Sequence, residues 1–270
     1  MKISKVNNFK TFDTELSVII PCLNEEKNIE KVIKLTLDAI KKIKINGEII
    51  IIDDGSTDKT LKIIEIYAHR YTEIRLVKHK KNLGIGMSFS HGVEIAKGQY
   101  ITMIPGDNEN SLIENLRYFF LRKDVDIIIP FVINKDMRSK SRRFISAIYN
   151  FIINVSFGIN LNYTNGTVIY NKKLLEFIEL KSTGFFYQTE LLIKLIRCGF
   201  LYAEVPQMLA ERQYGKSKAL TLRSLARLVR SYLYMINEIH IKHATGRRDN
   251  FYPPGTASEK RYRKIKNYNI

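Results

Sequence analysis

The stretch EIIIIDDGSTDKT, residues 48–60, decides the fold, because an uninterrupted apolar run ends abruptly in acidic and polar residues. Its four isoleucines show no polar alternation, which is typical of a strand buried on both faces of a parallel sheet. Helical spacing follows in residues 56–71, where Ser56 or Thr57 is placed to cap the helix. The stretch therefore predicts a buried strand followed by a crossover helix.

Similar apolar runs lie on both sides of this stretch. They are LSVIIP (16–21), EIRLVKH (73–79), QYITMIP (99–105) and VDIIIPFV (125–132). Helical patterns separate them, and the pattern at residues 86–97 precedes Gly98, which suits the left-handed position past a helix end. Residues 16 to 132 thus predict an α/β fold with right-handed crossovers, whose ligand site lies at the carboxyl ends of the strands.

The second half of the chain is less regular. We expect an apolar helix at residues 144–157 and an amphipathic basic helix at residues 220–243. The apolar composition of the first helix favours a place in the core over a role in lining a path for a lipid tail. For that second helix, packing on its own domain and lying at a membrane interface are equally supported. The expected divisions are an extension (1–15), the main domain (16–219), this helix, and a basic tail (244–270) with little regular structure.

Composition indicates a globular protein that meets anionic partners. The 270 residues include 44 Lys and Arg against 27 Asp and Glu, giving a net charge of +17. Cys22 and Cys198 form neither a disulfide framework nor a metal-ligand spacing, which favours a cytoplasmic location. No signal peptide and no apolar span of membrane length is recognised, so we expect at most peripheral attachment to the cytoplasmic face of a membrane.

Three acidic clusters follow three of the apolar runs. They contain Glu25, the pair Asp53 and Asp54, and the pair Asp107 and Glu109. The topology places them on one rim of the sheet, where clustered carboxylates repel one another unless a cation joins them. A hard divalent cation held by Asp107 and Glu109 is favoured over simple turn and capping roles.

Other chemistries find little support. The stretch NLGIGMSFSHG places Phe89 where a dinucleotide fingerprint needs its third glycine. The five histidines have no mutual spacing and are interpreted as structural or surface residues. Nucleic-acid binding is disfavoured, because the positive residues are not interleaved with stacking aromatics.

Four motifs together resemble one known family. They are SVIIPCLNEEKNIEKVI, EIIIIDDGSTDKT, NLGIGMSFSHGVEIAKGQYITMIPGD and ERQYGKSKA. The chain is similar to family-2 inverting glycosyltransferases, and within them to the polyprenyl-phosphate branch typified by dolichol-phosphate-mannose synthase. The resemblance implies a GT-A fold, in which helices flank a mixed, mostly parallel sheet, with C-terminal amphipathic helices added.

The resemblance also assigns roles by position. For the nucleotide-sugar it implies Pro21, Asn24, Glu25, Asp53, Asp54 and Gly84, and for Mg²⁺ or Mn²⁺ it implies Asp107 and Glu109. It implies Arg212 and Lys218 for the diphosphate or the acceptor phosphate, and Arg142, Arg143 and Ser217 for the acceptor. Two positions depart from the family pattern. Pro105 replaces the first Asp of Asp-x-Asp, and Leu23 replaces an aromatic residue beside the base.

The acceptor is inferred from the need for a base. A hydroxyl must lose a proton on attack, whereas a phosphate is already ionised at neutral pH. Hydroxyl-using relatives place a Glu-Asp pair where this chain has Glu190 followed by Leu191, so polyprenyl phosphate is favoured. A glycan hydroxyl with Glu190 as base is the alternative. The second alternative is a non-catalytic nucleotide-sugar-binding protein, because Pro105 stands where the family pattern has the first Asp carboxylate.

Overall fold

In the computed structural model, residues 14–107, 112–134, 136, 139–208, 222–242 and 252–268 are described. They form a seven-stranded sheet of order β3-β2-β1-β4-β6-β5-β7. Its strands are β1 (Leu16–Cys22), β2 (Gly47–Asp53), β3 (Ile74–Lys78), β4 (Tyr100–Met103), β5 (Ile127–Val132), β6 (Ile169–Asn171) and β7 (Tyr202–Gln207). The sheet is parallel except at β6, which runs antiparallel to both β4 and β5.

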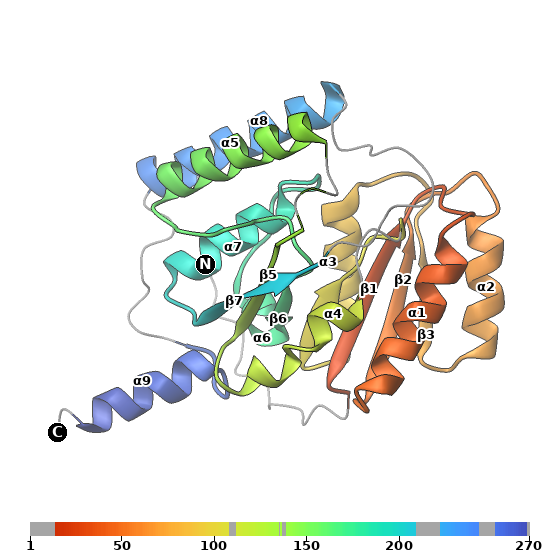
Figure 1. Ribbon diagram of the computed structural model, residues 1–270, viewed down its shortest axis with the longest axis horizontal. Helices are drawn as coiled ribbons and strands as arrows, with labels where there is room; N and C mark the ends of the chain where they lie inside the picture. Colours follow the sequence, from red (N-terminus) through yellow and green to blue (C-terminus); the bar gives the residue numbers. More distant parts are fainter. Residues whose placement is uncertain are drawn as a thin grey trace.

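Helices cover both faces of the sheet (Figure 1). They are α1 (Ile29–Lys42), α2 (Thr60–Arg70), α3 (Ile85–Ile95), α4 (Leu112–Leu116), α5 (Lys140–Phe157), α6 (Lys172–Phe177), α7 (Tyr187–Arg197), α8 (Leu222–Ile236) and α9 (Ala257–Tyr268), with a 3₁₀ turn η1 (Phe119–Lys123) and a π turn η3 (Asn237–Ile241). Among these helices, none combines the length and the apolar composition needed to cross a bilayer.

The buried strands divide their side chains between two cores. Strand side chains alternate in direction, so Ile50 and Ile52 of β2 join one cluster while Ile49 and Ile51 join the other. All four are fully buried. This confirms that residues 48–53 form a strand covered on both faces.

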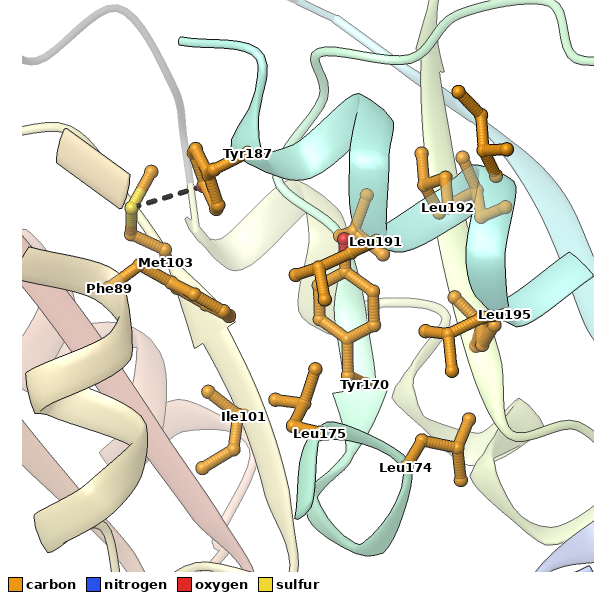
Figure 2. Packing of buried hydrophobic residues seen from close by; sticks show 14 of the residues in the cluster. Phe89, Ile101, Met103, Tyr170, Leu174, Leu175, Tyr187, Leu191, Leu192 and Leu195 are labelled. Atoms are coloured by element: carbon orange, nitrogen blue, oxygen red, sulfur yellow. Dashed lines mark hydrogen bonds between the residues drawn. The ribbon is translucent and has the colours of Figure 1, made fainter. Parts of the chain in front are cut away.

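The larger core lies between the sheet and helices α3 and α7 (Figure 2). Phe89 of α3 packs against Tyr170 of β6 and Tyr187 of α7, with ring centroids 6.2 and 5.0 Å apart. The Tyr187 hydroxyl donates a hydrogen bond to Sδ of Met103, at the end of β4, over 3.2 Å. These contacts fix the start of α7 against the end of β4, which borders the candidate site.

Two capping expectations are wrong. Helix α2 begins only at Thr60, whose backbone N–H donates to the Asp58 carboxylate over 2.9 Å, so neither Ser56 nor Thr57 caps it. Helix α3 ends at Ile95, and Gly98 lies beyond its C-cap. A Cβ at Gly98 would approach the backbone N of Ser17 to 2.4 Å, so close packing against β1 explains the glycine.

The second half contains more structure than the sequence predicts. Strands β6 and β7 complete the sheet, and the expected basic tail contains helix α9. The buried Asp126 carboxylate accepts hydrogen bonds from the backbone N–H groups of Ala257 and Ser258 at the start of α9, over 2.7 and 2.9 Å. A tertiary contact therefore anchors this helix, and no local pattern signals it.

Helix α5 differs from its expected core position. Only Ile153 and Phe157 among its residues are buried. Large apolar side chains of α5 are exposed instead: Phe144, Ile145, Ile148, Phe151, Ile152 and Val155. Helices α5 and α8 lie side by side along one edge of the molecule (Figure 1).

Candidate active site

Two loops at the carboxyl ends of β1 and β2 are joined by hydrogen bonds. Asn24 takes a positive φ of 55°, and its Oδ1 accepts from the backbone N–H of Thr57 over 2.8 Å. Its own N–H donates to Oγ of Ser56 over 3.0 Å. The backbone N–H of Glu25 donates to Oγ1 of Thr60 over 2.8 Å. The polar residues after the second strand therefore hold the loop after the first one.

A pocket of about 370 Å³ opens beside these loops. Residues from the ends of β1, β2 and β4, the start of α3, the loop before α7 and helix α8 line it: Pro21, Cys22, Leu23, Glu25, Asp54, Asn82, Gly84, Ile85, Ser88, Pro105, Gly106, Asp107, Gly184, Phe185, Ser224 and Arg227. Five of the expected nucleotide or metal residues are among them, namely Pro21, Glu25, Asp54, Gly84 and Asp107. The expected position at the carboxyl ends of the strands agrees with this pocket.

Asp54 organises one wall of the pocket. Its two carboxylate oxygens accept from the backbone N–H groups of Leu83 and Gly84, each over 2.9 Å. One of them also lies 2.7 Å from Nδ1 of His79, whose Nε2 lies 2.9 Å from Nδ1 of His91. Two histidines interpreted from the sequence as unrelated thus form one chain behind this loop.

Asp53 is not among the residues that line the pocket. Its side chain is buried and accepts from the backbone N–H of Ser56 over 3.3 Å. Burial raises the pKa of the neighbouring Cys22 thiol well above its usual value, and the carboxylates of Asp53 and Glu25 raise it further. Cys22 therefore stays a neutral thiol in the pocket wall, which is consistent with a core cysteine.

Gly84 brings two loops into contact over the pocket. Its φ is +97°, and a Cβ there would lie 2.6 Å from the carbonyl oxygen of Thr183. The next glycine, Gly86, donates its N–H to that same oxygen over 2.8 Å. The absence of side chains at these glycines thus allows the loop before α7 to reach the pocket.

Glu190 lies outside the pocket, although we considered it as a candidate base. Its fully buried carboxylate accepts from the backbone N–H groups of Lys181 and Ser182 over 3.0 and 2.8 Å. Nζ of Lys194, one turn further along α7, also donates to it. In this arrangement the carboxylate holds the loop before α7, whose Gly184 and Phe185 line the pocket.

Arg142 and Arg143 also lie away from the pocket, at the first turn of α5. Nη1 of Arg143 lies 2.7 Å from Oδ1 of the exposed Asp136. Four expected site residues, Glu109, Arg212, Ser217 and Lys218, lie outside the described residues.

Helix α8 supplies two pocket residues that we did not predict from the sequence. Ser224 and Arg227 both line the pocket. Nη1 of Arg227 lies 4.0 Å from the position that a Cβ of Gly84 would occupy. The only sequence signal was an arginine beside an apolar helical stripe, and such a pattern equally suits a solvated face.

The described donors suit a metal ion bound together with a diphosphate. Within the described residues, no group of three His, Cys, Asp or Glu side chains converges as metal ligands. Asp107 supplies one carboxylate in the pocket, directly after Gly106. Mg²⁺ commonly takes one or two protein carboxylates and completes its octahedron with water and substrate phosphate oxygens. A pocket that both Asp107 and Arg227 line is consistent with that mode.

Comparison with known proteins identifies the class. Residues 17–178 match the family model Glycosyl transferase family 2, and the chain belongs to this family. Its α/β fold is of the GT-A type.

Curated relatives match part of the chain. A dolichyl-phosphate beta-glucosyltransferase of Trichomonas vaginalis is 30% identical over 145 residues, 49% of this chain and 44% of that protein. YibD, an uncharacterized glycosyltransferase of Escherichia coli, is 35% identical over 119 residues, 42% of this chain and 32% of the relative. The matches thus span less than half the length of these relatives.

Solved structures share the fold. Glucosyl-3-phosphoglycerate synthase of Mycobacterium tuberculosis, in complex with Mn²⁺, UDP and glucosyl-3-phosphoglycerate, has a TM-score of 0.58 at 19% identity, covering 87% of this chain and 86% of that one. TarS of S. aureus, residues 1–349 with UDP-GlcNAc, has a TM-score of 0.58 at 18% identity, covering 83% and 67%.

Proposed function

We propose that this protein transfers a sugar, with inversion, from a nucleotide-sugar to a polyprenyl phosphate at a membrane surface. The observation that carries the choice of acceptor is the state of Glu190. This candidate base is fully buried and its carboxylate is bonded to two backbone N–H groups and to Lys194. A phosphate acceptor, which is already ionised, needs no such base.

The pocket walls suit the donor. Pro21 and Glu25 flank its β1 side, and Asp54 holds the Leu83–Gly84 backbone in place opposite. We assign these residues to the nucleoside, with Asn24 and Asp53 fixing the loops behind them. Leu23 offers an apolar contact to the base in place of an aromatic stack.

Negative charge grows on the diphosphate as the bond to the sugar breaks. Arg227 is positioned to receive that charge, and electrostatic stabilisation of this kind acts on the transition state more than on the ground state. Asp107, with Glu109, would hold a divalent cation, which when bound neutralises the leaving diphosphate as a Lewis acid. We assign Arg212, Ser217 and Lys218 to the same phosphates.

Two further observations support a lipid-linked acceptor. The Trichomonas vaginalis relative is named for dolichyl phosphate, a lipid phosphate. Helix α5 exposes an apolar stripe that begins next to Arg142 and Arg143, which suits an acceptor with an anionic head and an apolar tail.

A donor and acceptor panel tests the proposal. Purified protein with Mg²⁺ or Mn²⁺ is incubated with UDP-, GDP-, CDP- and dTDP-sugars, with and without undecaprenyl phosphate in detergent, and released nucleoside diphosphate is measured. We expect release that depends on the lipid phosphate with one nucleotide. Release that requires a glycan and not the lipid would favour the hydroxyl-acceptor alternative. Nucleotide binding without release under any condition would favour the non-catalytic alternative.

A further inference from the structure

Helices α5 and α8 present an unusual surface. Phe144, Ile148, Phe151 and Val155 follow helical spacing along α5, and each is exposed to solvent. On α8, Leu225, Val229 and Leu233 repeat every four residues and are also exposed. Exposed apolar side chains that gather on a surface mark sites of protein or membrane interaction.

The two stripes lie on neighbouring helices, which are in contact at their C-terminal ends. The hydroxyls of Ser156 and Tyr232 lie 2.8 Å apart, and the rings of Phe157 and Tyr232 meet edge to face at 5.8 Å. Nε2 of His240, in the turn after α8, lies 2.7 Å from the carbonyl oxygen of Ser156. Figure 1 shows the pair lying along one edge of the molecule.

The basic residues beside the two stripes indicate which partner this surface binds. Arg230 lines the same shallow groove as Leu225, Val229 and Leu233, and Lys140 and Arg142 lie at the start of α5. The chain carries a net charge of +17, so a second copy would be repelled, whereas an anionic leaflet attracts basic residues near its surface. Apolar stripes flanked by arginine and lysine are the pattern of helices that lie in a lipid interface.

Helix α8 also reaches the donor pocket. Arg227 lies two residues after Leu225 and two before Val229, which on a helix is nearly the opposite side, and it lines the pocket. The buried residues of α8 and the following turn are Met235 and Ile239, near the C-terminal end, while residues 225–227 are exposed. Leu228 packs against the main core from the N-terminal half of α8, but the fully buried side chains of this segment lie toward its C-terminal end.

We propose that the exposed faces of α5 and α8 form one docking surface for an anionic lipid bilayer, and that docking fixes the N-terminal half of α8, with Arg227, over the donor pocket. The inference rests on the proposed function for its purpose, since a lipid-linked acceptor is met at a membrane. It makes the bilayer a regulator of the donor site as well as the source of acceptor.

Vesicle co-flotation of the full chain tests the surface. The probes are vesicles of phosphatidylcholine alone and of phosphatidylcholine with phosphatidylglycerol, both without polyprenyl phosphate. We expect binding to the anionic vesicles, lowered about tenfold by Val229→Glu with Leu233→Glu and also by Phe151→Glu with Val155→Glu. Arg230→Glu lowers binding to the anionic vesicles roughly tenfold. The matched control, Ile66→Glu at an exposed apolar position of α2, changes binding less than about twofold.

Hydrogen exchange tests the link to the pocket. Anionic vesicles should slow amide exchange in residues 222–230 of wild type but not in the Val229→Glu, Leu233→Glu variant. Protection confined to the basic helix α9, or absent from α8, would overturn the proposal. So would a wild-type protein that ignores anionic vesicles, or a dimer in light scattering that dissociates in the α8 variant.

The docking inference and the proposed function fail in different ways. If docking is wrong, the variants still transfer sugar to undecaprenyl phosphate in detergent while vesicle binding is absent or unchanged. If the function is wrong, vesicle binding follows the expected pattern and no nucleoside diphosphate is released. The melting temperature of each variant is also measured. Values near that of wild type would show that the substitutions at exposed positions leave the fold intact.

Discussion

At the scale of single residues, the pocket depends on side chains with separate tasks. Asp107 lines the pocket after β4. The two carboxylate oxygens of Asp54 accept hydrogen bonds from the backbone N–H groups of Leu83 and Gly84, and one of them also contacts His79. Sequence patterns group both as rim carboxylates. The structure shows that both line the pocket and that Asp54 also positions the loop at Leu83 and Gly84.

Replacing Asp107 tests the metal assignment. Asp107→Ala removes the one carboxylate that we assign to the cation within the described pocket, so we expect kcat to fall by about 10²–10³-fold. The measurement is nucleoside diphosphate release across a manganese titration, with the exposed Asp124→Ala as control. An Asp107→Ala enzyme with unchanged activity and metal dependence would contradict the assignment.

Gly84 is predicted to tolerate no side chain. Gly84→Ala places a Cβ against the carbonyl oxygen of Thr183 at a positive φ, so we expect a loss of about 1–3 kcal/mol in unfolding free energy and a raised KM for the donor. Gly184→Ala is the matched control for stability, because its Cβ would meet nothing within 4 Å. Denaturant melts and donor titrations of both variants provide the comparison, and equal stability of the two would refute the expectation.

Glu190 is predicted to hold the loop before α7 in place and not to act as a base. Glu190→Gln leaves the nearly buried Lys194 ammonium without its carboxylate, so we expect stability to fall by about 3–5 kcal/mol. Adding Lys194→Met removes the unpaired charge and should restore most of that loss. If Glu190 were the base, the double variant would be stable yet inactive with every acceptor. Activity retained with lipid phosphate is the expected result.

At the scale of elements, α8 contributes to two surfaces at once. Its apolar stripe is exposed, its inner residues Met235 and Leu228 pack on the main core, and Arg227 reaches the pocket. Helical periodicity predicts the stripe, because apolar residues recur at three- and four-residue spacing. Which neighbouring arginine meets the pocket depends on how the helix is placed against α3 and the loop before α7.

Arg227 is predicted to stabilise the leaving diphosphate. We expect Arg227→Ala to lower kcat/KM for transfer to detergent-solubilised undecaprenyl phosphate by about 10²-fold, with Arg227→Lys recovering part of it. Thermal melting should stay near that of wild type, because the side chain is exposed. If Arg227→Ala lowered kcat/KM in vesicle assays but not in detergent, Arg227 would serve membrane docking alone.

At the scale of the whole molecule, distant segments are fixed by buried polar contacts. Asp126, before β5, accepts hydrogen bonds from the first turn of α9, although the two lie more than a hundred residues apart in the chain. Burial raises the pKa of Asp126, and the bonds from Ser258 and Ala257 oppose that rise. This carboxylate connects the C-terminal helix to the sheet together with Oγ of Ser258, which accepts from the backbone N–H of Leu201 over 2.8 Å.

Removing that contact should release α9. Asp126→Ala leaves two backbone N–H groups of α9 without their acceptor, so we expect a loss of about 2–4 kcal/mol in unfolding free energy. Hydrogen exchange in residues 257–268 should become faster while residues 47–53 keep their protection. Slow exchange in both segments of the variant would show that other contacts hold the helix.

Sequence patterns determined the first half of the fold, because its signals are local. The apolar run at residues 49–52, the acidic residues that end it and the helical spacing at residues 29–40 each lie within a few positions of one another. Chain direction then brings the carboxyl ends of β1, β2 and β4 to one rim, so a site there follows from topology alone.

Only the tertiary structure decided which side chains form the pocket and which face of a helix stays exposed. Arg227 lines the pocket, Glu190 lies outside it, and α5 exposes Phe144 and Phe151, because each position depends on contacts between segments distant in sequence. Periodicity shows that a helix has an apolar face. Periodicity does not show what covers that face. Whether the face meets solvent, lipid or the protein core is decided only when the neighbouring elements are in place.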